Sequence, residues 1–192
     1  DSGKITGMVL CLHVDDKIRL NCVRYASWQT VTKQDDQMTQ VAVGHAVPDF
    51  EVPATGDKTF RLSDFRGKNV LIYFYPKDNT PGCTLEGQNF RDNIDFFNQH
   101  NTVIVGVSRD SLRKHQNFRE KHRFPFDLLA DEDEAVCKLF DVIKLKKLYG
   151  KEHLGIERST FLIDSGGVLR QEWRKVKVKD HIDEVKEAIS VL

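Results

Sequence analysis

The sequence predicts an α/β fold with a central mixed β-sheet flanked by helices on both faces. Near-continuous apolar runs, helical periodicities between them and turn signals at their ends support this prediction. The runs do not alternate between apolar and polar residues, which indicates strands buried on both faces. These runs are Asn69–Tyr75, Thr102–Ser108 and Ser159–Ile163.

Further elements are expected between and around these runs. A short strand is predicted over Asp57–Leu62, and a turn at Ser165–Gly167 leads into a last strand over Val168–Trp173. Helices are predicted where apolar residues recur at helical spacing. The helical segments are Thr84–His100 (with Phe90, Ile94 and Phe97), Leu112–Arg123, Glu134–Phe140 and a final helix with Asp180 as N-cap and Ile182, Val185 and Ile189 on one face.

Composition excludes several classes of protein. The 192 residues include 29 basic and 29 acidic side chains, and this balance argues against a dedicated nucleic-acid binder or a polybasic membrane-surface protein. No run approaches the roughly 18 apolar residues needed to span a bilayer. Four cysteines are too few for a secreted disulfide scaffold. We therefore expect a cytoplasmic protein in which a cysteine is buried or reactive.

The N-terminal part differs from the rest of the chain in its residue pattern, because the apolar runs that predict strands all lie after residue 41. Residues 1–40 are predicted to be an N-terminal extension or leader, and residues 41–192 the folded domain. The apolar run Met8–Val14 is a weak match to a secretory signal, because it is short and precedes two aspartates rather than a small-residue cleavage site. A second hypothesis takes Met38 as the original start, which would leave everything before it outside the native protein.

The segment between the first long apolar run and the next helix contains the strongest candidate for a reactive residue. The strand stops at Pro76, a polar loop follows, and Cys83 opens the helix. A helix N-terminus presents unpaired N–H groups and about half a positive charge, and both favour thiolate over thiol. On spacing alone, Cys83 is also compatible with an inert, buried residue.

Ionisation of Cys83 cannot by itself supply fast chemistry. A free thiol is a few per cent ionised at pH 7, so full ionisation gains roughly 30-fold, or about 2 kcal/mol. Larger gains require groups that stabilise the transition state. Thr80, three residues before Cys83, offers a hydroxyl that could hydrogen-bond an incoming oxygen.

The stretch Pro76–Glu86 (PKDNTPGCTLE) resembles the Pro-x-x-x-Thr/Ser-x-x-Cys motif of peroxiredoxins. Within that family it is similar to the bacterioferritin-comigratory-protein, or peroxiredoxin Q, subgroup. Three further segments extend the resemblance over about residues 41–192. Val43–Phe50 resembles the family's opening strand, Leu62–Lys68 the segment before the first buried strand, and Tyr149–Asp164 the stretch with the active-site arginine.

The resemblance implies a thioredoxin-like fold and reduction of hydrogen peroxide and organic hydroperoxides without a metal or organic cofactor. Cys83 would attack one peroxide oxygen and become a sulfenic acid. Thr80 would hydrogen-bond the peroxide, and Arg158 would keep Cys83 ionised and stabilise charge on the breaking O–O bond. Pro76 would shield the pocket from water, and Glu86 would orient Arg158.

The sequence departs from the subgroup at the position of its second cysteine. Many members carry a resolving cysteine five residues after the first, where this chain has Gln88. The expectation is a one-cysteine mechanism, in which glutathione, glutaredoxin or thioredoxin reduces the sulfenic acid directly. Cys137 is expected to be a buried hydrophobe, but it, Cys11 and Cys22 remain alternatives as resolving cysteine. The chain is expected to be a monomer or weak dimer.

Two other thiol functions compete with peroxide reduction. A thiol–disulfide oxidoreductase favours Cys-x-x-Cys at the helix start, but Thr80 and Glu86 occupy the positions three before and three after Cys83. A redox sensor or thiol-dependent binding protein would use the same activated cysteine and stays open.

Two binding functions are disfavoured. Cys11, His13 and Cys22 lack an evident fourth ligand, so they do not predict a zinc site. The basic patch of Lys144–Lys147 with Arg174–Lys179 is interpreted as a solvated face rather than a nucleic-acid site.

Overall fold

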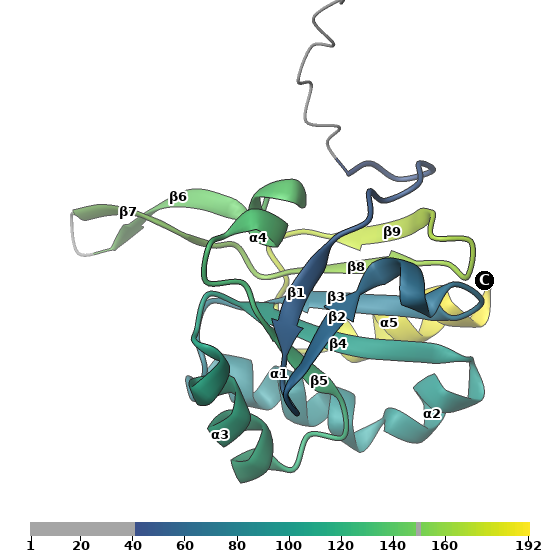
Figure 1. The fold of residues 1–192 in the computed structure, drawn as a ribbon, viewed down its shortest axis with the longest axis horizontal. Helices are drawn as coiled ribbons and strands as arrows, with labels where there is room; N and C mark the ends of the chain where they lie inside the picture. Colours follow the sequence, from purple (N-terminus) through teal and green to yellow (C-terminus); the bar gives the residue numbers. More distant parts are fainter. Residues whose placement is uncertain (1–40, 149–150) are drawn as a thin grey trace, which may run out of the picture. The chain divides into compact units, whose positions relative to one another are not determined.

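The computed structural model describes residues 41–148 and 151–192. A mixed sheet has the strand order β2-β1-β5-β4-β3-β8-β9, and β6 pairs with β7 in a separate hairpin (Figure 1). The predictions for residues 1–40, including those for Met38, Cys11 and Cys22, lie outside the described residues. The strands are β1 (Glu51–Ala54), β2 (Lys58–Arg61), β3 (Asn69–Phe74), β4 (Thr102–Ser108), β5 (Asp127–Ala130), β6 (Ile143–Leu148), β7 (Lys151–Ile156), β8 (Ser159–Ile163) and β9 (Leu169–Trp173).

Helices cover both faces of the sheet, as predicted. One face packs against α1, α2, α3 and α5, and the other against α4 and the short 3-10 helix η1 (Figure 1). The bounds are η1 (Leu62–Phe65), α1 (Pro81–Asp92), α2 (Ile94–Gln99), α3 (Leu112–His122), α4 (Ala135–Leu139) and α5 (His181–Ser190).

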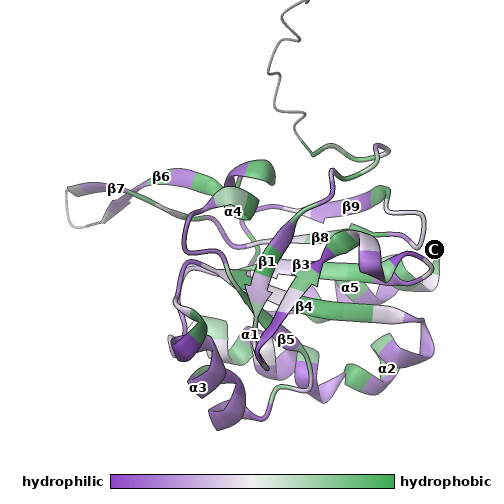
Figure 2. Cartoon of the chain, viewed as in Figure 1, coloured by the Kyte–Doolittle hydropathy of each residue, from purple (hydrophilic) through white to green (hydrophobic). Residues whose placement is uncertain are grey.

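Strand β3 is the centre of the fold because it contributes to two cores. Its neighbours β4 and β8 run parallel and antiparallel to it. Side chains alternate between the faces: Val70, Ile72 and Phe74 join the core under α4, and Leu71 and Tyr73 join the core under α1. Figure 2 shows the resulting hydrophobic colour along β3 and β4. Each fully buried side chain of this size contributes about 1.5–3 kcal/mol.

The predicted strands are confirmed at β2, β3, β4, β8 and β9, but the expected opening strand is wrong. Val43–Phe50 makes a single isolated bridge, between Ala46 and Val168, and the first strand begins at Glu51. Gly44 has a φ of +85°, which turns the chain, and Pro48 has no N–H to donate to a ladder. Val47 still packs into the core.

The helix predicted over Thr84–His100 is two helices that meet at Asn93. The side-chain amide of Asn93 donates to the carbonyl oxygen of Asn89 at 2.9 Å, and Lys186 Nζ donates to Asn93 Oδ1 at 3.2 Å. Short polar side chains that bond to nearby backbone compete with helix continuation. Phe90 and Phe97 nevertheless share one core, as their spacing indicated.

Two smaller findings concern charged segments. Asp180 precedes α5 as predicted, but its φ is +64° and its side chain makes no capping hydrogen bond. The basic run Lys144–Lys147 lies within β6, which pairs with β7, and its residues are exposed or half-buried, in agreement with the interpretation as a solvated face. The lysines obscured the strand pattern, because a hairpin outside the main sheet needs no continuous apolar run.

Candidate active site

Cys83 is the third residue of α1, at the end of the sheet where β3 stops. Thr80 is the N-cap in extended conformation, and Pro81 is the first helical residue, a position that needs no N–H donor. Cys83 is 2% exposed and belongs to the core between α1 and the sheet. The local sequence thus places a buried sulfur beside the unpaired N–H groups of a helix start.

Arg158, directly before β8, contacts this sulfur from the strand next to β3. Because β8 pairs with β3 in the register Phe74–Ser159, Arg158 lies beside the point where β3 gives way to the Cys83 loop. Its Nη2 donates to Cys83 Sγ at 3.3 Å. A Cβ on Gly82 would lie 3.3 Å from Nη2, so the glycine before the cysteine leaves room for the guanidinium.

Glu86, one turn after Cys83, accepts a hydrogen bond and ion pair from Arg158 Nη1. Burial raises the pKa of Glu86 to about 7, against the opposing charge and hydrogen bond of Arg158. Its Oε1 is buried and has no hydrogen-bond partner among the described residues, which is consistent with that direction. Burial alone would lower the pKa of Arg158, but the charges of Glu86 and Cys83 outweigh it and raise that pKa.

Thr80 and Pro76 lie in the loop between β3 and α1, and they contact the site less directly. The Thr80 hydroxyl donates to the carbonyl oxygen of Lys77 at 3.1 Å, which leaves its lone pairs rather than its proton for another group. Pro76 is half-buried directly after the strand. The structure therefore joins Cys83, Arg158 and Glu86 by direct contacts, and brings Thr80 and Pro76 to the same loop.

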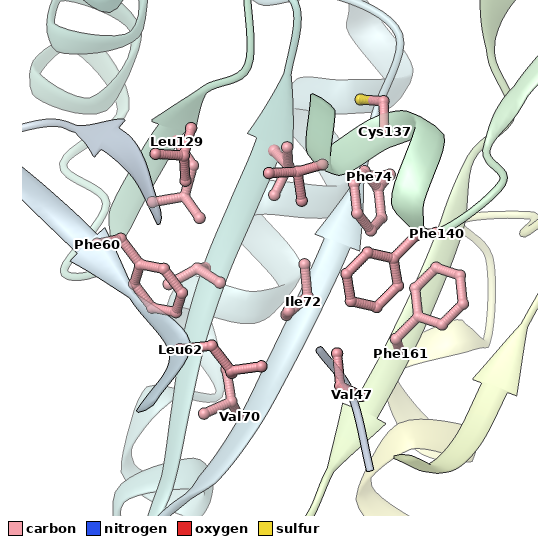
Figure 3. Close-up of a cluster of buried hydrophobic side chains, with 14 of the residues drawn as sticks. Val47, Phe60, Leu62, Val70, Ile72, Phe74, Leu129, Cys137, Phe140 and Phe161 are labelled. Carbon is pink, nitrogen blue, oxygen red and sulfur yellow. The ribbon is translucent and has the colours of Figure 1, made fainter. Parts of the chain in front are cut away.

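Cys137 lies on the opposite face of the sheet from Cys83. It is fully buried in the core between α4 and the strands, near Phe74 (Figure 3). Burial, a hydrogen bond to Asp131 and the charge of that carboxylate all raise the pKa of the Cys137 thiol far above its ordinary value. The prediction that Cys137 is a buried hydrophobe is confirmed.

Sequence reasoning missed two features near the site. Lys146 on β6 is half-buried and donates to the carbonyl oxygen of Ile156 at 2.5 Å; burial lowers its pKa, while the charge of Cys83 opposes this. A buried hydrogen-bonded group of Tyr75, Asp78 and His115 lies behind the loop. Asp78 stands inside the peroxiredoxin-like motif, but nothing local in the sequence connects it with a histidine 37 residues later.

Within residues 41–148 and 151–192, no cluster of three or more His, Cys, Asp or Glu side chains is arranged to hold a metal ion. No helix in that part of the chain is long and apolar enough to cross a membrane.

Comparisons with known proteins agree on one family. The AhpC/TSA family matches residues 43–172. Peroxiredoxin Bcp of Bacillus subtilis is 52% identical over 149 residues, covering 78% of this chain and 95% of that protein. Peroxiredoxin Bcp of Escherichia coli is 38% identical over 148 residues, covering 77% and 95%. A solved structure of Xanthomonas campestris peroxiredoxin Q has a TM-score of 0.73 and 46% identity, covering 79% of this chain and 96% of that one.

Proposed function

This chain belongs to the AhpC/TSA family as a thiol-dependent peroxidase of the bacterioferritin-comigratory-protein type, and we propose that Cys83 reduces peroxides by a one-cysteine mechanism. The observation that carries the proposal is the 3.3 Å contact between Arg158 Nη2 and Cys83 Sγ. A fixed guanidinium beside a sulfur at a helix start favours the thiolate and supplies hydrogen-bond donors for a peroxide oxygen.

The reaction begins with attack of the Cys83 thiolate on one oxygen of hydrogen peroxide or an organic hydroperoxide. An S–O bond forms, the O–O bond breaks, and sulfur loses two electrons to the departing oxygen. That oxygen takes a proton and leaves as water or an alcohol, and Cys83 becomes a sulfenic acid. Arg158 stabilises the negative charge that develops along the O–O axis, and Thr80 hydrogen-bonds the peroxide. Pro76 limits water access, and Glu86 orients Arg158.

Reduction of the sulfenic acid is proposed to use an external thiol. Gln88 occupies the position of the usual resolving cysteine, and Cys137 is separated from Cys83 by the sheet. The external thiolate attacks sulfur and water leaves, giving a mixed disulfide; a second thiol then displaces Cys83. We propose thioredoxin, glutaredoxin or glutathione as donor, in the cytoplasm, with the chain a monomer or weak dimer.

Replacement of single cysteines tests the mechanism. Cys83→Ser is expected to abolish peroxide consumption, because the nucleophile is gone, whereas Cys137→Ser keeps turnover within about twofold, since a buried structural thiol adds no step. Steady-state assays with each thiol donor measure both. Loss of turnover in Cys137→Ser, together with a Cys83–Cys137 bridge in the mass spectrum of oxidised wild-type protein, would contradict the one-cysteine mechanism.

The same assay separates the enzyme from a redox sensor. A peroxidase consumes many equivalents of peroxide when thiol donor is in excess. Consumption of a single equivalent with every donor would favour a sensor or thiol-dependent binding protein that uses the same cysteine.

A further inference from the structure

A buried polar group holds the loop that follows β3. Asp78 lies between Pro76 and Thr80 in that loop and is 7% exposed, and His115 on α3 is fully buried beside it. His115 Nδ1 lies 2.9 Å from Asp78 Oδ2 and 3.1 Å from Oδ1. The Tyr75 hydroxyl donates to Asp78 Oδ1 at 2.8 Å.

Both ring nitrogens of His115 face oxygen acceptors. Nδ1 also lies 3.3 Å from the Tyr75 hydroxyl, which gives its one proton to the nearer Asp78 Oδ1 at 2.8 Å. Nε2 lies 3.1 Å from the carbonyl oxygen of Leu129 on β5, and a carbonyl can only accept. A carboxylate also accepts only, so Nδ1 satisfies Asp78 by donating. A neutral imidazole has one N–H and would leave one of these contacts without a proton. A ring with an N–H on each nitrogen supplies a donor to both acceptors at once.

Tyr75 is the second donor to the carboxylate. Burial raises the pKa of the Tyr75 hydroxyl well above its ordinary value, and the charge of Tyr73 and the charge and hydrogen bond of Asp78 act in the same direction. Tyr75 therefore stays protonated and donates to Asp78. Asp78 thus receives one hydrogen bond from the end of β3 and one from α3, which satisfies a carboxylate that is almost without water.

The loop is anchored to three surrounding elements at this residue. The backbone N–H of Asp78 donates to Asp110 Oδ2 at 2.8 Å, in the segment after β4. His115 adds contacts to α3 and β5. Asn79 follows with a φ of +57°, and Thr80 then caps α1. A shift of the backbone at Asp78 would therefore also displace Thr80, the N-cap residue two positions later, and with it the start of the helix that bears Cys83.

We propose that His115 is a doubly protonated positioning residue whose ion pair with Asp78 holds the loop. The loop in turn fixes the position of Thr80 and of the start of α1, where Cys83 lies. This deepens the proposed function and rests on the assignment of Cys83 as the nucleophile. His115 touches neither peroxide nor sulfur, and it acts through Asp78.

The protonation state can be measured without any turnover. Long-range ¹H–¹⁵N NMR of the histidine rings in the full chain reports whether each nitrogen carries a proton, and the spectrum of His115→Gln identifies the missing signals among the seven histidines. The expected result at pH 7 is a ring with protons on both nitrogens. A ring with a bare Nδ1 overturns the proposal.

The chain offers a matched pair of substitutions for the positioning role. An Asn amide at position 115 can place its N–H near Nδ1, facing Asp78, whereas a Gln amide places it near Nε2, facing Leu129. Both variants lose the ring and the charge. The readout is the second-order rate constant for a single oxidation of Cys83 by hydrogen peroxide, without reductant, measured by quench and mass spectrometry.

The contact with Asp78 is expected to decide the rate. Loss of a hydrogen bond to a buried carboxylate lowers the rate about tenfold or more in His115→Gln, and His115→Asn retains most of it. Val136→Ala, in the core under α4, controls for general destabilisation and is expected to keep the wild-type rate while its unfolding midpoint falls. Wild-type rates in both His115 variants, or a slower rate in His115→Asn than in His115→Gln, overturn the positioning role.

Failure of this inference is distinguishable from failure of the proposed function. If Cys83→Ser is inactive while both His115 variants oxidise at the wild-type rate, the nucleophile stands and the positioning role is wrong. If Cys83→Ser still consumes peroxide catalytically, the proposed function is wrong and the positioning role falls with it.

Discussion

At the scale of single residues, Glu86 is a buried carboxyl group whose charged form is disfavoured by desolvation. It is a carboxylate on a buried helix face, paired through one oxygen with Arg158, while the other oxygen has no partner among the described residues. A buried ion pair of this kind offsets its desolvation only in part. The gain lies in geometry, because the pair holds the guanidinium where Nη2 meets Cys83 Sγ.

The raised pKa of Glu86 predicts a pH dependence of stability. Burial raises this pKa from 4.5 to about 7, so between these values the folded chain holds a proton that the unfolded chain has released. Stability therefore falls as the pH rises from 4.5 to 7, by up to about 3 kcal/mol, and then levels off. Glu86→Gln removes this decline because its amide does not titrate.

Urea unfolding across pH 4.5 to 8 measures this effect. Glu120→Gln, at an exposed position of α3, is the control and should follow the wild-type profile. A Glu86→Gln profile parallel to wild type would show that Glu86 is ionised throughout the range.

At the scale of elements, helix α1 packs closely against aromatic side chains, and this close packing requires a glycine in the helix. Gly87 is buried in the face that meets Phe124, and a Cβ there would lie 2.5 Å from Phe124 Cζ. The ring cannot retreat easily, because it stacks on Phe126 at 5.3 Å and meets Phe118 edge-on at 5.1 Å. The glycine serves close packing beside the site rather than a turn.

Gly87→Ala is predicted to destabilise the protein although alanine favours helix. The propensity gain is about 1 kcal/mol, whereas forcing a methyl group into a packed aromatic cluster costs roughly 1–3 kcal/mol. We expect a net loss of about 1 kcal/mol, measured by urea unfolding. Asn89→Ala, two residues on in the same helix, raises helix propensity without entering the Phe124 cluster and should not destabilise. A more stable Gly87→Ala variant would show that Phe124 repacks freely.

At the scale of the whole described domain, the sheet keeps two thiols apart. Cys83 belongs to the core under α1 and Cys137 to the core under α4, and β3 contributes side chains to both. A disulfide needs Cα atoms within about 7 Å, with the two Cβ atoms directed toward each other. Because the two thiols lie in separate cores, their pairing would require a rearrangement of the fold.

This separation predicts how Cys137 reacts with an alkylating reagent. Cys137 is fully buried with a raised thiol pKa, so it should be labelled about 10³-fold or more slowly in native protein than in urea. Peptide mapping by mass spectrometry follows Cys137 separately from the other cysteines. Native labelling at a rate close to that in urea would mean that the core under α4 opens easily.

Much of the fold was predictable because its strands and helices produce recognisable patterns of apolar and polar residues over short stretches of the sequence. The runs that became β3, β4 and β8 are apolar without alternation, and this pattern arises only when both faces of a strand are covered. The loop motif around Cys83 is also a local pattern, and it predicted a thiol at a helix start. The break at Asn93 and the charged hairpin of β6 and β7 were missed, because each depends on neighbours that the local sequence does not reveal.

By itself, the sequence pointed to Cys83 as the proposed nucleophile, placed it at the start of a helix and showed that position 88 is Gln rather than Cys. The tertiary structure decided which distant groups complete the site. Arg158 lies 75 residues after Cys83, and His115 lies 37 residues after Asp78. They meet because the antiparallel register of β8 on β3 and the packing of α3 against β5 bring these segments together. Hydrogen bonds and ion pairs act over a few ångströms, so only the folded chain could assign these partners.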